Sequence, residues 1–191
     1  MMDHVHVDRL AAQGATLKSG NLREDVKLPL GEDINEWLAT NTEDFYNHIS
    51  VLYSTLGEFC TPATCPIMDA GSKDEDTIFL PVTVTVSAPE YVECLMDWIG
   101  TQIDDETIFP RKTEAPFPPY FKDFVKRILK GMYRVYAHIY RSHFKKIVHL
   151  KAEAHLNTCF ENLVFFVTEF QVVDKIEMDS LKELVEKILD P

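Results

Sequence analysis

Apolar residues recur every three or four positions in five stretches of the chain, which is the pattern of amphipathic helices. The first stretch runs from Asn41 to Gly57, and Thr40 with Glu43 has the spacing of a capping box at its start. The second begins at Ser87, a residue typical of N-caps, and Pro89 and Glu90 follow in its first turn. The apolar positions of these two predicted helices are Phe45, Ile49, Leu52, Leu56, Val92, Leu95, Ile99 and Ile103.

Three further helices are predicted over residues 120–143, 160–170 and 181–188. The first of these carries an apolar face from Phe121 to Ile139. A second face holds basic residues at helical spacing, namely Lys122, Lys126, Lys130 and Arg134. Only Val82–Val86 alternates with the period of a strand, after an acidic turn. We therefore expect a mainly α fold with one small β-hairpin.

Composition places the chain among ordinary globular proteins. It has 191 residues and a mass of 22.0 kDa, which fits one domain of about 100–200 residues, and no linker or repeat divides it. Hydrophobic residues make up 46% and charged residues 26%, so the chain can bury a core. No apolar run approaches the roughly 20 residues that cross a bilayer, and the N-terminus does not resemble a secretory signal. We expect an intracellular protein.

Charge is distributed unevenly along the chain. The net charge is -12, which opposes a general role in binding nucleic acid or anionic membranes and favours a basic partner. Residues 111–151 nevertheless contain eleven basic and two acidic side chains, a local net charge of +9. These basic residues are either the solvated side of a helix or a site for a second, anionic ligand.

Two cysteines and two histidines form a candidate metal site. Cys60 and Cys65 lie in a predicted turn, and His138 and His143 have the same intervening gap. Zn²⁺ accepts two thiolates and two neutral imidazoles in a tetrahedron. On a continuous α-helix the two histidines would point about 140° apart, so the helix must bend or end between them. The alternative is two buried thiols and two ordinary surface histidines.

Catalytic motifs are absent from the sequence, which contains no HExxH, GxSxG or phosphate-binding glycine loop. A zinc ion with four protein ligands has no position for a reactive water. The acidic residues Glu32, Glu36 and Asp44 have no evident partner base. The alternative function is a zinc-dependent hydrolase, which would use His138 or His143 at an open, three-ligand site.

Several blocks of the sequence carry a resemblance to a known family. These blocks are Gly31–Trp37, Asn41–Phe45, Glu58–Thr61, Asp104–Pro110, Arg134–Tyr140 and Glu153–Thr158. With them, the chain from about Thr16 to Ile188 resembles the Mob family of kinase activators, in particular its founding branch.

The resemblance implies an N-terminal extension over residues 1–30 and a helical domain with a four-helix core over residues 31–191. It implies a non-catalytic adaptor that binds the N-terminal regulatory region of nuclear-Dbf2-related and large-tumour-suppressor kinases. It also implies that an upstream Hippo-type kinase phosphorylates Thr16, for which the alternative is an inert N-terminal linker. A phosphopeptide of that kinase is a further implied partner.

The resemblance further implies a role for each candidate residue. The sequence departs from the family pattern in two places. Residues 71–87 lack an expected aromatic block, and Gly131 stands where the phosphopeptide site would have a third cation, so we expect that site to be weakened. The implied residues are Cys60, Cys65, His138 and His143 for structural zinc, Glu32, Glu36 and Asp44 for kinase binding, and Lys130 and Arg134 for phosphopeptide binding.

Overall fold

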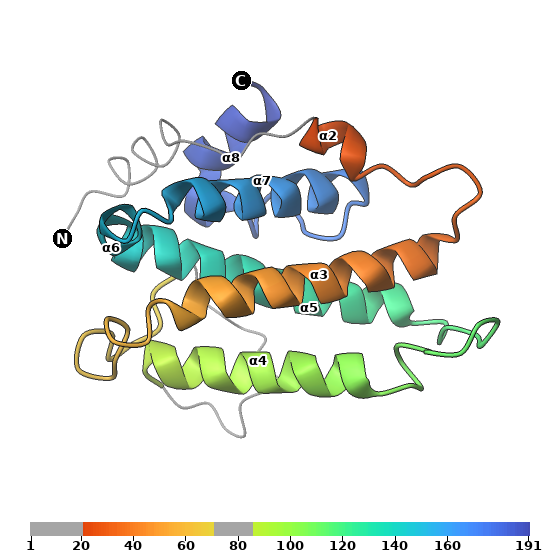
Figure 1. Cartoon of the computed structure of the whole chain (residues 1–191), viewed down its shortest axis with the longest axis horizontal. Coiled ribbons are helices and arrows are strands. Elements are labelled where there is room, and N and C mark those ends of the chain that lie inside the picture. Colours follow the sequence, from red (N-terminus) through yellow and green to blue (C-terminus); the bar gives the residue numbers. More distant parts are fainter. Residues whose placement is uncertain (1–20, 71–85) are drawn as a thin grey trace.

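The computed structural model describes residues 21–70 and 86–191, and these residues are mainly helical (Figure 1). No strand occurs among them. The predicted hairpin at Val82–Val86 lies outside the described residues apart from Val86. The elements are α2 (Leu22–Asp25), α3 (Ile34–Ser54), α4 (Ala88–Asp104), α5 (Phe121–His138), the π-helix η1 (Ile139–His143), α6 (Phe144–His149), α7 (Glu153–Glu169), the 3-10 helix η2 (Asp179–Leu181) and α8 (Lys182–Leu189).

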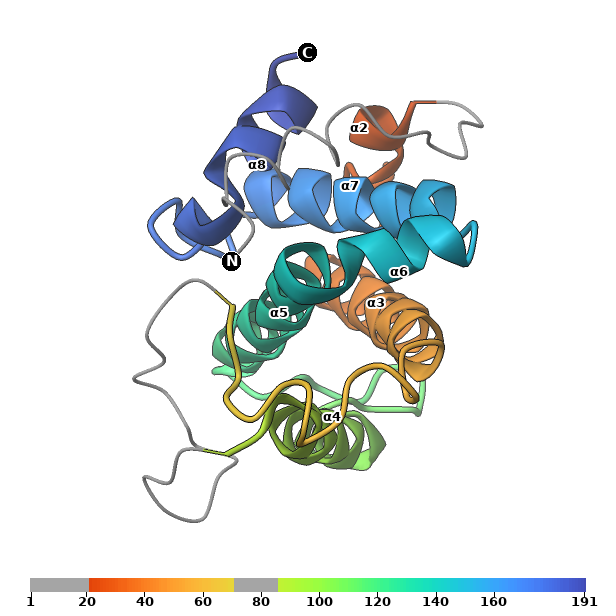
Figure 2. The ribbon, with the colours of Figure 1, turned by 90° about the vertical axis from the view of Figure 1, so that its left-hand side faces the viewer.

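Helix α5 lies at the centre of the fold. Helices α3, α4 and α5 run side by side, and α7 crosses them on the side away from α4, with α2 and α8 beyond it (Figures 1 and 2). Every residue from Gly131 to Tyr140 is buried, as expected of a helix with neighbours on all sides. No helix in the described part of the chain is long and apolar enough to cross a membrane.

Helix α4 begins as its sequence predicts. The Ser87 hydroxyl accepts a hydrogen bond from the Glu90 amide at 3.4 Å, and the Glu90 carboxylate accepts one from the Ser87 amide at 3.1 Å. This reciprocal pair is a capping box. The apolar residues predicted for this helix, from Val92 to Ile103, are buried.

The predicted start of helix α3 is wrong. The helix begins at Ile34, where the Asp33 carboxylate accepts hydrogen bonds from the amides of Asn35 and Glu36, so Thr40 lies inside the helix rather than at its cap. The residues before Asn41 belong to the helix because their side chains contact the rest of the protein. Leu38 packs in the core, and the Trp37 indole donates a hydrogen bond to the carbonyl of Val26. An apolar repeat that is counted from Phe45 onwards does not show an N-cap at Asp33.

Gly131 marks a close approach of two helices. A β-carbon at this position would lie 2.7 Å from Cδ1 of Leu95 on α4, which is shorter than a normal contact. Gly131 therefore faces the core, and the position where the family resemblance expects a cation is filled by the packing of Leu95.

Replacing Gly131 with alanine should destabilise the protein. At an open helix position this change would add about 1 kcal/mol of stability, but overpacking a core costs about 1–3 kcal/mol, and Leu95 is fully buried. Urea unfolding should give Gly131→Ala a lower free energy of unfolding than wild type. The double variant Gly131→Ala/Leu95→Ala should be less destabilised than the two single effects added together. A more stable Gly131→Ala protein would contradict this account of the packing.

Candidate functional site

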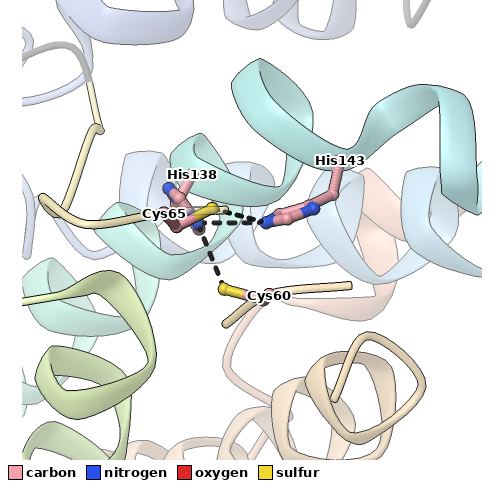
Figure 3. A group of neighbouring side chains, drawn as sticks. All are labelled: Cys60, Cys65, His138 and His143. Carbon is pink, nitrogen blue, oxygen red and sulfur yellow. Dashed lines mark hydrogen bonds between the residues drawn. The ribbon is translucent and has the colours of Figure 1, made fainter. Parts of the chain in front are cut away.

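The four predicted ligands converge on one buried point. Cys60 and Cys65 lie in the loop that follows α3, His138 ends α5 and His143 ends η1 (Figure 3). The four ligand atoms all lie within 4.8 Å of one another, and all four residues are buried. The Sγ of Cys60 is 3.5 Å from Nε2 of His138, and the Sγ of Cys65 is 3.4 Å from Nε2 of His143.

A wide helical turn brings the two histidines together. The prediction that the helix must change between them is confirmed, because residues Ile139–His143 form a π-helix between α5 and α6. A π-turn inserts extra backbone into the helix and is often found at functional sites. It brings the Nε2 atoms of His138 and His143 to 3.2 Å from each other.

A contact outside the ligand set orients His138. The backbone carbonyl of Asp69 lies 2.7 Å from Nδ1 of His138, and a carbonyl can only accept, so this nitrogen carries the proton. The lone pair of Nε2 is then directed at the cluster, as in metal-bound histidines. The Asp69 side chain is held in turn by Nε of Arg141 at 3.4 Å.

A tyrosine hydroxyl contacts the first cysteine. The Tyr53 hydroxyl, from the last turn of α3, donates to the Sγ of Cys60 at 3.2 Å. Sequence reasoning missed Tyr53, Asp69 and Arg141. No spacing rule links them to the ligands, although Arg141 lies within the gap between the two histidines.

Burial favours the neutral forms of three of these side chains, those of His138, His143 and Cys60. It lowers the pKa of His138 and lowers that of His143 to about 4, with the neighbouring His138 adding to the second effect. It also raises the pKa of the Cys60 thiol to about 11, against the hydrogen bond from Tyr53. At pH 7 the imidazoles are therefore ready to bind a metal ion, whereas Cys60 must first lose its proton.

The donor set fits a closed metal site. Two sulfur and two imidazole donors suit a tetrahedral ion. Because all four side chains converge, an ion bound by them has no open position for a water or a substrate. This geometry opposes the hydrolase alternative, which needs one of the four ligands to be displaced.

The three predicted kinase-binding carboxylates are exposed. Glu32 precedes α3, Glu36 lies in its first turn and Asp44 in its third. Eight residues separate the two helical carboxylates, which places them about 80° apart around the axis and about 12 Å apart along it. The neighbouring Glu43 is paired with Arg111 at 3.0 Å.

The predicted phosphopeptide residues differ in their exposure. Lys130 is partly exposed and pairs with Glu177 at 2.9 Å. Arg134 is buried, and its Nε donates to the Tyr91 hydroxyl of α4 at 3.0 Å. The alternative that the basic residues are simply the solvated side of the helix does not hold for Arg134, since α5 is surrounded by other elements at this level. Lys122 and Lys126, by contrast, are exposed.

The remaining candidates are less informative. Thr16 lies outside the described residues. Cys159 is buried in α7 and Cys94 is half-buried in α4. His149 is exposed at the end of α6.

Comparison with known proteins gives consistent matches over most of the chain. A sequence model of the Mob1/phocein family matches residues 14–181. The chain is 60% identical over 181 residues to the MOB kinase activator-like 1A protein of Arabidopsis thaliana, covering 93% of this chain and 84% of that protein. It is 54% identical over 179 residues to the MOB kinase activator-like 1 homolog A of Dictyostelium discoideum, covering 92% and 84%.

The metal-free protein should lose stability as the pH falls below neutrality. The pKa of His143 is about 4 in the folded state against an ordinary 6.5, so between these values the unfolded chain binds the proton more readily. Urea unfolding with a chelator present should show a loss of about 1–2 kcal/mol from pH 7 to pH 4.5. His143→Gln should reduce this slope, and the control His149→Gln should leave it unchanged. Stability that is flat or rises over this range would contradict the neutral, buried state of His143.

Proposed function

The chain belongs to the Mob1/phocein family, and we propose that it is a non-catalytic co-activator of nuclear-Dbf2-related or large-tumour-suppressor kinases. It binds the N-terminal regulatory region of the kinase and is held in shape by a structural zinc ion. The observation that carries the co-activator role is the similarity over more than nine-tenths of the chain to proteins named kinase activators. Family membership makes the chain a regulator of kinases rather than an enzyme.

The acidic end of α3 is the proposed kinase-binding surface. Between Glu24 and Asp44 the chain has seven acidic residues and one lysine, which favours a basic segment as partner. Exposed ion pairs contribute only about 0–1 kcal/mol each, so affinity also needs apolar contacts. Leu30 is fully exposed and Ile34 is 40% exposed, on either side of Glu32. A basic helix with apolar residues on one face fits this combination.

Charge reversal on this surface should weaken kinase binding. The double variant Glu32→Lys/Glu36→Lys replaces attraction with repulsion, and we expect affinity for the basic N-terminal segment of the kinase to fall by about tenfold or more. Isothermal titration calorimetry measures this, and the difference from wild type should shrink at high salt. The variant Glu183→Lys is the control for a general change in charge, because the Glu183 side chain is exposed on α8. Equal affinity of the double variant and wild type would mean that the surface is merely solvated.

Zinc is the metal that we propose for the Cys2His2 cluster. Zn²⁺ is commonly held by two thiolates and two imidazoles in structural sites. The two pairs come from segments more than 70 residues apart in the chain, so one ion would link the loop after α3 to the end of α5. The ion supplies no chemistry beyond this link.

Purified protein should contain one zinc ion per chain, and zinc binding at pH 7 should release protons. Cysteine binds zinc as thiolate, whereas burial raises the pKa of metal-free Cys60 to about 11. Calorimetric zinc titrations in buffers of different ionisation enthalpy count the protons. Cys60→Ala should lower the melting temperature sharply, and the control Cys94→Ala should lower it less. Well under one zinc per chain, with unchanged folding, would refute the site.

A weakened phosphopeptide site is the further part of the proposal. Lys130 and Arg134 lie one helical turn apart, a spacing that suits one phosphate. Both are engaged within the protein, Lys130 by Glu177 and Arg134 by Tyr91, and Gly131 adds no cation. The exposed Lys126 lies one turn before Lys130. An incoming phosphate would have to displace the Glu177 carboxylate, which supports weak binding.

Removing the Glu177 charge should strengthen phosphopeptide binding. We expect Glu177→Gln to raise the affinity for a phosphothreonine peptide by about threefold to tenfold, because Lys130 then has no competing carboxylate at this contact. Fluorescence anisotropy measures this, with Glu183→Gln as the control and Lys130→Ala as the variant that loses binding. Identical weak binding by all of these proteins would show that Lys130 is not part of a phosphopeptide site.

Phosphorylation of Thr16 by an upstream Hippo-type kinase also belongs to this proposal. A phosphate would add about -1.5 to -2 charges to the N-terminal segment.

A further inference from the structure

The Tyr53 hydroxyl is directed at a candidate metal ligand rather than at a backbone group. Tyr53 lies in the last turn of α3, and its oxygen is 3.2 Å from the Sγ of Cys60. Other hydroxyl side chains of this helix, those of Thr42, Ser50 and Ser54, donate to backbone carbonyls of α3 itself. Tyr53 instead connects α3 to the loop that carries both cysteines.

The cysteine that Tyr53 contacts has little access to water. Cys60 is 3% exposed, so a thiolate at this position depends on donors from the protein. At Cys65 the nearest hydroxyl, that of Thr64, is 3.9 Å away and already donates to the carbonyl of Phe59 at 2.7 Å. Tyr53 is therefore the better-placed hydroxyl donor to either sulfur among the described residues.

A hydrogen bond to a metal thiolate has two effects. It stabilises the negative sulfur relative to the protonated thiol, which favours metal binding over proton binding. It also lowers the energy of the sulfur lone pairs, so a charge-transfer transition from sulfur to metal moves to higher energy. A tyrosine hydroxyl that only filled space would produce neither effect.

We propose that Tyr53 is a positioning residue of the metal centre, whose hydroxyl holds Cys60 as a thiolate ligand and ties α3 to the ion. The proposal rests on the proposed zinc site. Loss of contacts outside the ligand set typically lowers metal affinity about 10–100-fold, and we expect Tyr53→Phe to lower zinc affinity by a factor in this range.

The test compares Tyr53→Phe with Tyr46→Phe. Tyr46 lies two turns earlier on the same helix and is also half-buried, but its hydroxyl lies close to Gly100 on α4. Competition with a chromophoric chelator measures zinc affinity, and cobalt substitution gives the spectrum. Tyr53→Phe should bind zinc about 10–100-fold more weakly and show its sulfur-to-cobalt band at longer wavelength, whereas Tyr46→Phe should match wild type in both.

The outcomes separate this proposal from the zinc site itself. If wild type binds no zinc, the proposed site fails; if wild type binds one zinc and Tyr53→Phe is unchanged in affinity and spectrum, only the role of Tyr53 is overturned.

A measurement on the unmutated protein covers the case in which Tyr53→Phe does not fold. In wild type loaded with ¹¹³Cd, the Tyr53 hydroxyl proton should exchange slowly with water and show scalar coupling to the metal. A fast-exchanging hydroxyl proton without coupling would overturn the proposal.

Discussion

The wide turn at Ile139–His143 is the constraint on which the rest of the site depends. The end of α5 is enclosed by other elements, so a shift of the whole helix cannot bring His138 and His143 to a common point. The π-turn changes the direction of His143 relative to His138 within one helical turn. The cysteine loop can then complete a four-ligand cluster, and that loop is the segment that follows α3. A local change in helix geometry thereby connects the centre of the fold to the helix that carries the acidic surface.

This arrangement suits a scaffold better than a catalyst. The only convergent cluster of metal-ligand side chains among the described residues is buried and closed, and the exposed carboxylates of α3 lie on a surface instead of in a pocket with a base. The chain has acidic and basic regions that are separate in sequence, and the structure engages part of the basic region internally through Glu177 and Tyr91. Binding partners through surfaces of defined charge requires the helices to be held firmly, which is what a metal link between distant segments provides.

Sequence reasoning predicted the features that depend on local spacing. The capping box at Ser87, the apolar faces of α4 and α7, and the cluster of four candidate metal ligands all follow from residue type and interval. The start of α3 was missed because its apolar repeat was counted from Phe45, whereas the helix is capped at Asp33. The burial of Arg134 was missed because helical periodicity cannot show that neighbours enclose the second half of α5, from Gly131 to His138. Sequence reasoning did predict a break between the two histidines, but the form of that break, a π-turn, depends on the surrounding packing.

In the proposed zinc site, a metal ion ties the loop after α3 to the end of α5. Amide hydrogen exchange on zinc-loaded and metal-free protein tests it most directly, because exchange reports local opening segment by segment. Removal of zinc should speed exchange in residues 56–70 and 138–149 and in the last turns of α3, while the middle of α7 changes least. Equal exchange rates in these segments with and without zinc would contradict the claim.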